Sequence, residues 1–402
     1  MTECRDALGL AQQFINSKTG TPYQQESLLI FYLVIDVSYH LICGRAKSAH
    51  PVLKQLHQSI QRLARLGDSS QTTSVSCPEI DRFEWMPQEY MVILVYLVTV
   101  VQLMQSGALE RAQRSADKAL TQIEKLCDID SSPLLPIFHV NLLEHTAMGR
   151  LVMGVNTAAL EDISKACRIC NSNNGMLVKR LPQLHTLLGL YSMSMNLMQD
   201  SEAQFTLALN FLVNRIFREA QQVLETCHCL KAASSYVAAF LAFCQNKIPE
   251  AKQLLRETVN LGNEEELNRI STSALITMGQ IHFNENSLQE GKRVISAAIS
   301  VAEKLPDIGI QLWATALLKE IAKSLGEAEE ERKWFAEHDR YSKMVITDYY
   351  KAARAPDHHI LVPWLNDPLP ALPVPSVQAP TSETLPMTTG NSGSIFNSGA
   401  PV

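Results

Sequence analysis

The chain repeats one pattern of apolar and polar positions: an apolar helical stretch, a small or turn-forming residue, and a second helical stretch that often contains alanine. Seven residues are expected to form these turns: Gly44, Gly107, Gly154, Asp200, Asn246, Asn286 and Gly326. The best-spaced turns recur about every 40 residues, a period that indicates stacked helix pairs. The predicted fold is therefore all-α, an α-solenoid of tetratricopeptide-like antiparallel helix pairs that form a superhelix.

The predicted solenoid covers residues 1–354. Its helix pairs are expected over about 24–66, 87–127, 134–171, 182–210, 231–261, 267–305 and 308–354. A lone helix over Arg5 to Ser17 precedes them, and a Ser/Thr-rich loop is expected from Asp68 to Pro78. Pro87 begins the second pair, and the fourth pair is expected to begin near Pro182, because proline suits the first turn of a helix.

One interval, residues 210–230, breaks the rhythm. After Asp200 the next turn signal, Asn214-Arg215, leaves no room for a full first-arm helix. The stretch from Arg218 to Cys227 is therefore interpreted as a second arm without its mate. Because each arm of a solenoid buries its apolar face on a neighbour, this gap predicts a step or an exposed patch there.

The second pair has the clearest helical pattern. Its first arm, Tyr90 to Met104, is too short to span a bilayer comfortably, since a spanning helix takes about 20 residues. Thr99 and Gln102 also interrupt it, so a buried helix at the centre of a stack is predicted. The return helix places apolar side chains three or four residues apart: Leu109, Ala112, Ala116, Leu120, Ile123 and Leu126.

The fourth pair contains Leu187-Leu188-Gly189-Leu190-Tyr191, which resembles the tetratricopeptide signature L-G-x-x-Y with the tyrosine one residue early. Gly189 is expected where the partner helix packs closest, and Tyr191 is expected to fill the groove beside it. Small and aromatic residues follow after the turn, at Ala203, Phe205 and Ala208.

The composition changes after residue 354. Half of the 18 prolines lie in residues 355–402, mixed with serine, threonine and glycine. Such a segment buries too little apolar surface to offset its ordering entropy, so a disordered tail is predicted over 355–402. The stretch from Val362 to Leu365 is the part expected to dock, either onto the last helices or onto a partner.

Charge and cysteine usage narrow the class of protein. A net charge of −6 argues against tight nucleic-acid binding, so no direct nucleic-acid site is expected. The nearest basic groups, Lys179-Arg180 and the scattered Arg111, Arg114 and Lys118, are interpreted as solvated helix faces. The first six residues contain acids and lack an apolar core, so no secretory signal is expected. Nine cysteines, mostly in apolar helical patterns, indicate reduced thiols in the cytosol or nucleus.

Two cysteine clusters contain residue types that can bind a metal ion. Cys167 and Cys170 have ligand spacing but lie in an amphipathic pattern without a second C-x-x-C. Cys227, His228 and Cys229 are adjacent, and adjacent helical residues point about 100° apart, so they do not chelate one ion easily. Packing thiols are predicted at both clusters.

Histidines and acid clusters point to no active site either. His145 and His185 are interpreted as packed histidines, because no nucleophile is placed beside them. The acid clusters Glu264 to Glu266 and Glu327 to Glu331 fall where helices are expected to begin, which suits the helix dipole. No catalytic, metal-binding or cofactor-binding residue is predicted, and partner-binding residues stay unassigned.

Several stretches resemble the metazoan MAU-type chromatid cohesion factors, the tetratricopeptide subunit of the cohesin loader. They run in consistent order from about residue 20 to 365: Met86 to Val100, Leu142 to His145, Gln183 to Tyr191, Glu202 to Phe205, Glu250 to Lys252, Leu255 to Thr258, Glu266 to Arg269, Lys304 to Asp307 and Gln311 to Trp313. The resemblance implies a non-catalytic nuclear scaffold that embraces the N-terminal segment of the large HEAT-repeat loader, of the Nipped-B or delangin type. Cohesin would be contacted indirectly and chromatin through the complex, which promotes sister-chromatid cohesion and mitosis.

Two departures from that family's pattern are expected to weaken partner binding. The family has further repeats before Met1, which here begins inside a repeat, and it has a segment that is missing before Asn214. A truncated gene model, a divergent paralogue and a shortened form with reduced loader binding remain open. Two other classes are alternatives: a co-chaperone-like clamp for acidic C-terminal peptides, which needs spaced cations, and an enzyme or zinc protein built on the cysteines.

Overall fold

The computed structural model describes residues 2–16, 21–70, 85–130, 132–173, 175–211, 227–365 and 368–372. Within these ranges the regular structure is helical and contains no strand. Consecutive helices pack on one another as pairs, so the all-α solenoid of tetratricopeptide-like pairs is confirmed. Predicted features at 71–78, 212–226 and 373–402, including the turn at Asn214 and most of the unpaired arm, lie outside the described residues.

The helices before the break in rhythm are α1 (Thr2–Asn16), α2 (Pro22–Ile42), α3 (Ala46–Ser70), α4 (Gln88–Gln105), α5 (Leu109–Cys127), α6 (Leu134–Val152), α7 (Asn156–Ser172) and α8 (Met176–Ser194). Residues 198–211 form a further helix. The helices after the break are α10 (His228–Cys244), α11 (Ile248–Glu264), α12 (Asn268–Asn284), α13 (Leu288–Ala302), α14 (Ile308–Leu325), α15 (Ala328–Ala353) and α16 (Pro356–Leu361).

Six of the seven predicted turn residues lie in turns with a left-handed backbone. Gly44, Gly107, Gly154, Asn246, Asn286 and Gly326 have φ values between 60° and 81°. The chain must adopt this conformation to reverse between arms, and glycine and asparagine adopt it at the lowest cost.

The seventh predicted turn residue, Asp200, is wrong. The fourth pair turns at Asn196, with φ 58°, whereas Asp200 lies inside the following helix. Pro182 does not begin that pair either, because α8 starts at Met176 and contains Pro182 in its second turn. At that position proline removes the N–H that would donate to the carbonyl of Val178. Similarly α3 continues to Ser70, past the expected start of the loop at Asp68.

The fourth pair otherwise packs as its sequence predicts. A Cβ on Gly189 would lie 2.7 Å from Cε1 of Phe205, so only glycine allows this approach. Tyr191 is fully buried beside it. In the second pair, α5 buries Leu109, Ala112, Ala116 and Ile123 of the predicted stripe, while Leu120 and Leu126 are partly buried.

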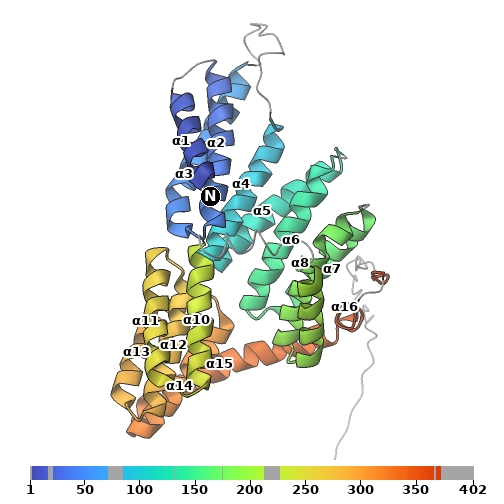
Figure 1. The fold of residues 1–402 in the computed structure, drawn as a ribbon. Coiled ribbons are helices and arrows are strands. Elements are labelled where there is room, and N and C mark those ends of the chain that lie inside the picture. Colours follow the sequence, from blue (N-terminus) through green and yellow to red (C-terminus); the bar gives the residue numbers. More distant parts are fainter. Residues whose placement is uncertain are drawn as a thin grey trace, which may run out of the picture.

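The helices form two stacks that meet end to end (Figure 1). The first arms of the second stack begin at His228, Asn268 and Ile308, at intervals of 40 residues. A Cβ on Gly154 would lie 2.6 Å from Cγ2 of Ile308, and one on Gly107 would lie 2.9 Å from Cδ2 of Leu305. The glycine turns of the first stack are therefore also the contact points for the second.

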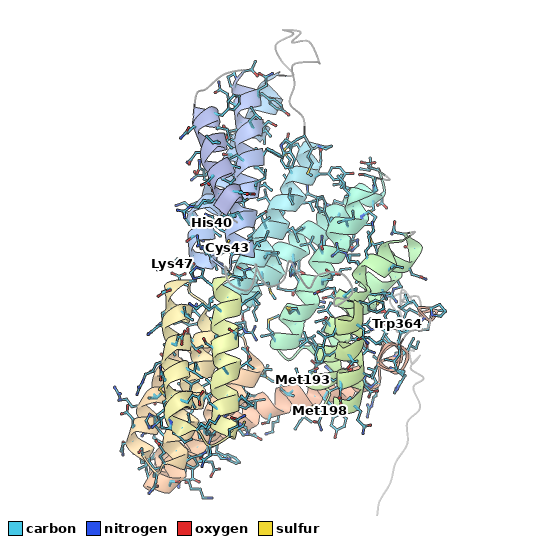
Figure 2. All side chains as sticks on the ribbon, in the orientation of Figure 1. His40, Cys43, Lys47, Met193, Met198 and Trp364 are labelled. Carbon is cyan, nitrogen blue, oxygen red and sulfur yellow. The ribbon has the colours of Figure 1, made fainter. Side chains whose placement is uncertain are left out.

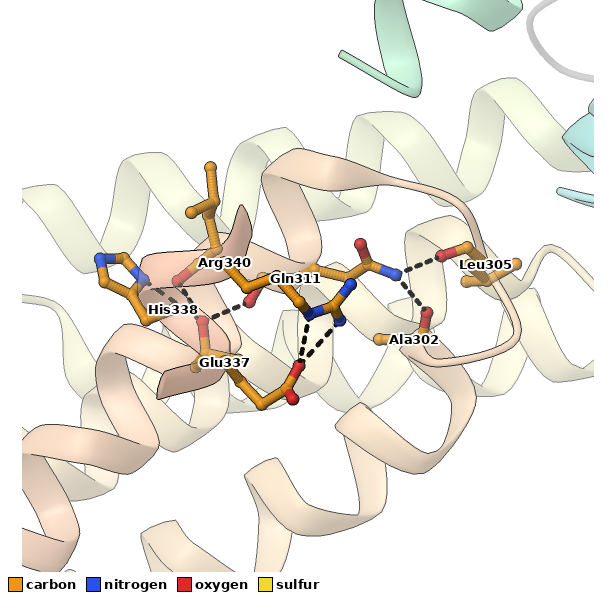
Figure 3. A network of polar contacts seen from close by, with 8 residues as sticks. Ala302, Leu305, Gln311, Glu337, His338 and Arg340 are labelled. Carbon is orange, nitrogen blue, oxygen red and sulfur yellow. Dashed lines mark hydrogen bonds and ion pairs between the residues drawn. The ribbon is translucent and has the colours of Figure 1, made fainter. Parts of the chain in front are cut away.

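Helix α15 returns from the second stack to the first (Figure 1). The Thr157 N–H at the start of α7 donates to Oδ2 of Asp348 at 3.1 Å. Near the start of α14, the Gln311 side-chain amide donates to the carbonyls of Leu305 and Ala302, at 3.0 and 3.3 Å (Figure 3). On α15, Arg340 forms an ion pair with Glu337. The Gln311 bonds join the segment before α14 to α14, and the Arg340–Glu337 pair lies within α15.

The predicted start of the disordered tail at 355 is wrong. Residues 356–361 form α16, and Leu361, Val362 and Trp364 are at most 6% exposed. These three apolar side chains join the core cluster of α7 and α8, and their burial offsets the cost of ordering the segment. The stretch from Val362 to Leu365 was expected to dock onto the last helices or onto a partner. Instead, Val362 and Trp364 pack in a cluster of α6, α7 and α8 that includes Ala352 at the end of α15, and Trp364 is buried there (Figure 2).

Two helices, α2 and α4, are long and apolar enough to cross a membrane by length and composition. However, α4 contacts α2, α3, α5 and α6, and buries eight of its residues, including Ile93 and Gln102. Burial in the stack therefore accounts for its apolar composition, as predicted.

Candidate partner-binding surface

The cysteine clusters lie in packed surroundings. Cys167 and Cys170 are buried in the core of the third and fourth pairs, and burial raises the pKa of the Cys170 thiol to about 11. Cys227 and Cys229 pack against Gly44 at the junction of the stacks. Within the described residues no group of three or more His, Cys, Asp or Glu side chains is arranged to hold a metal ion.

The two histidines considered as catalytic bases are also enclosed. Burial lowers the pKa of both His145 and His185. The His185 ring lies against Trp364, and its Nδ1 is 2.6 Å from Oε1 of Gln204. The structure thus engages His185 in packing and hydrogen bonding within the core.

Helix α10 presents an exposed apolar face. Only Ala232, Ala239 and Ala242 of this helix are buried, although most of its residues are apolar. Its exposed side chains recur at helical spacing, with exposed fractions of 40% for Leu230, 65% for Val237, 43% for Phe240 and 57% for Leu241. This face follows the interval 210–230, where the break in rhythm predicts a step or an exposed patch. Exposed apolar surface of this kind is typical of an interaction site.

A second surface is a cleft between α3 and α5, with α4 as its floor. The cavity has a volume of about 430 Å³. Four cations line it: Lys54 from α3, and Arg111, Arg114 and Lys118 from α5. His57 lies at its base, with Nε2 3.2 Å from Oγ1 of Thr99. Sequence reasoning missed this cleft, because Lys54 is more than 50 residues from Arg111 and the arginines alone resemble an ordinary solvated face.

Comparison with known proteins assigns the chain to a protein family. The model of the cohesin loading factor family matches residues 3–225 and 209–329. The chain belongs to the cohesin loading factor family. The two matched segments overlap within 209–225, where the rhythm of the helix pairs breaks.

Individual members of the cohesin loading factor family align over most of the chain. The MAU2 chromatid cohesion factor homologue of Drosophila ananassae is 33% identical over 94% of this chain and 64% of its own length. The homologue of Drosophila melanogaster is 34% identical over 89% of this chain and 61% of its own length. The chain thus spans less than two thirds of the length of these relatives.

Among solved structures, a Rap protein complexed with competence and sporulation factor superposes with a TM-score of 0.44 and 13% identity. The superposition covers 86% of this chain and 95% of the Rap protein chain. At this TM-score and identity the superposition indicates nothing about the surfaces of this chain.

Proposed function

We propose that this chain is a non-catalytic scaffold subunit of a cohesin-loading complex in the nucleus. It binds the N-terminal segment of a HEAT-repeat loader of the Nipped-B or delangin type, and contacts cohesin and chromatin through that complex. In this way it promotes sister-chromatid cohesion and mitotic progression. Its membership of the cohesin loading factor family is the observation that carries the proposal.

The exposed face of α10 supports a binding role and suggests where part of the segment lies. A helix that is apolar all round is normally buried, yet α10 leaves Val237 and Leu241 more than half exposed. An extended segment with apolar anchors would cover this face and restore the burial that neighbouring arms provide elsewhere. Stacked helix pairs form long surfaces suited to such segments.

The direct test is retention of the purified N-terminal segment of the large loader on the folded, immobilised chain. Retention that is lost when Val237 and Leu241 are both replaced by serine supports the proposal and the location. Failure of the folded chain to retain the segment contradicts the loader function for this chain. Retention that is unaffected by the α10 changes supports the function and shows that the segment binds at another surface.

A further inference from the structure

The α3–α5 cleft has a regular arrangement of charge. On α5, Arg111, Arg114 and Lys118 follow one another at three- and four-residue spacing, so they share one face of the helix. Lys54 faces them from α3 across the same cavity. Among the described residues that line the cavity there is no aspartate or glutamate.

Within the part of the chain that the structure describes, these four cations form no ion pair, whereas comparable lysines elsewhere are paired. Lys252 on α11 binds Glu285 at 2.6 Å, and Lys165 on α7 binds Glu124 at 2.8 Å. Lys292, 40 residues after Lys252, pairs with Glu327 in the same way. Among the described residues, no carboxylate lies within ion-pair distance of the four cleft cations. The cleft therefore holds positive charge that the fold itself does not neutralise.

We propose that the α3–α5 cleft binds an extended, glutamate- or aspartate-rich segment of a partner protein. The three α5 cations rise by about 4.5 and 6 Å along the helix. An extended peptide places every second side chain on one side at intervals of about 6.5 Å. A segment with acids at alternate positions therefore matches the row on α5, while Lys54 contacts it from the opposite wall. The four cleft cations can bind such a segment whichever protein supplies it and whatever covers α10.

A protein segment fits the cleft better than nucleic acid does. No Phe, Tyr or Trp is found among the described side chains that line the cavity, whereas single-strand binders stack bases on such rings. The chain as a whole has a net charge of −6, which repels a polyanion longer than the cleft. The cations are also spread along the helix and do not converge on one point, as a single phosphate would require.

The test uses a fluorescent peptide of about twelve residues, long enough to follow the row on α5, with alternating glutamate and serine and an amidated C-terminus. Its affinity is measured by anisotropy at low ionic strength, where exposed charges are least screened. The double variant R111E/R114E is expected to bind at least about tenfold more weakly, because two attractions become repulsions. K54E, on the opposite wall, is expected to weaken binding about threefold.

The matched control is K179E/R256E, which makes the same change of net charge at exposed cations of α8 and α11 that form no ion pair among the described residues. The proposal holds if this control and thermal unfolding are unchanged while R111E/R114E loses the peptide. It is overturned if the peptide does not bind, if a glutamine–serine peptide binds equally, or if both double variants lose affinity alike. Preference of the cleft for an oligonucleotide, or for a free C-terminal carboxylate, would also overturn it in favour of those ligands.

Discussion

The indole ring of Trp364 stacks on the imidazole of His185, with ring centroids 4.8 Å apart and planes 28° from parallel. Gln204 completes this contact, since its amide N–H groups donate to the carbonyls of Val362 and Trp364 at 3.0 and 2.8 Å. Its Oε1 must then accept from Nδ1–H of His185, which assigns the imidazole tautomer. One fully buried glutamine thus binds the C-terminal segment to the fourth helix pair.

Replacing Gln204 by alanine is expected to lower the free energy of unfolding by about 2–4 kcal/mol, because two carbonyls and an imidazole N–H lose their buried partner. Limited proteolysis should then cleave near Ala355 at an early stage. The control is Q199A, an exposed glutamine on the same helix, which should change stability by less than about 0.5 kcal/mol. Equal protease resistance of Q204A and the unchanged protein would contradict the role assigned to Gln204.

Substitutions at two glycines can distinguish two costs in unfolding free energy: that of a side chain on a left-handed backbone, and that of a side chain at the contact between the stacks. Gly154 and Gly326 both have φ 73°, but a Cβ on Gly154 meets Ile308, whereas one on Gly326 meets nothing within 4 Å. G326A should therefore cost about 1 kcal/mol, and G154A about 1–3 kcal/mol more, owing to overpacking. Urea denaturation measures both.

The cost of G154A should also depend on Ile308. In the double variant G154A/I308A the two effects should be less than additive, because removing Cγ2 of Ile308 relieves the clash. Strict additivity would show that the end-to-end contact does not cause the difference between the two glycines.

The exposed face of α10 should matter for binding and not for folding. V237S/L241S is expected to reduce affinity for the loader segment at least tenfold, about the value of two apolar anchors. Its unfolding midpoint should stay unchanged, because both side chains are already exposed to solvent. F335S, at a side chain that is 61% exposed on α15, serves as the control in titration calorimetry. A similar loss of affinity in F335S would argue against a specific role for α10.

The stability of the protein should depend on pH through Glu144. Burial raises the pKa of this carboxyl to about 7 despite the Arg180 guanidinium 3.2 Å away. In the unfolded chain glutamate ionises near its ordinary pKa, so the folded state binds the proton more tightly. The stability that this proton contributes is complete below about pH 4.5 and is lost as the pH rises through about 7.

E144Q removes that dependence. Relative to the unchanged protein, the variant should gain roughly 2–3 kcal/mol of unfolding free energy between pH 5 and pH 8. Chemical denaturation across this range measures the difference, with E264Q on an exposed carboxylate as the control. A constant difference between E144Q and the unchanged protein across that range would contradict the raised pKa.

Local spacing predicted most helices, because a buried stripe requires apolar residues every three or four positions. The stripe from Leu109 to Ile123 and the close contact at Gly189 were found in this way. Asn196 was missed in favour of Asp200, since both residues favour turns and only the packing of α8 decides where it ends. The buried Trp364 lies in a proline-rich stretch, and composition alone does not indicate which side chain finds a pocket.

By itself, the sequence determined the repeated helix pair, most of its turns and the family resemblance, because these depend on residues close together along the chain. Only the tertiary structure decided which surfaces are closed and which remain open. It brought Gly154 to Ile308, Gln204 to Trp364, and Lys54 to the arginines of α5. These contacts join residues separated by more than 50 positions, and their geometry depends on how rigid helices stack, which leaves no periodic trace in the sequence.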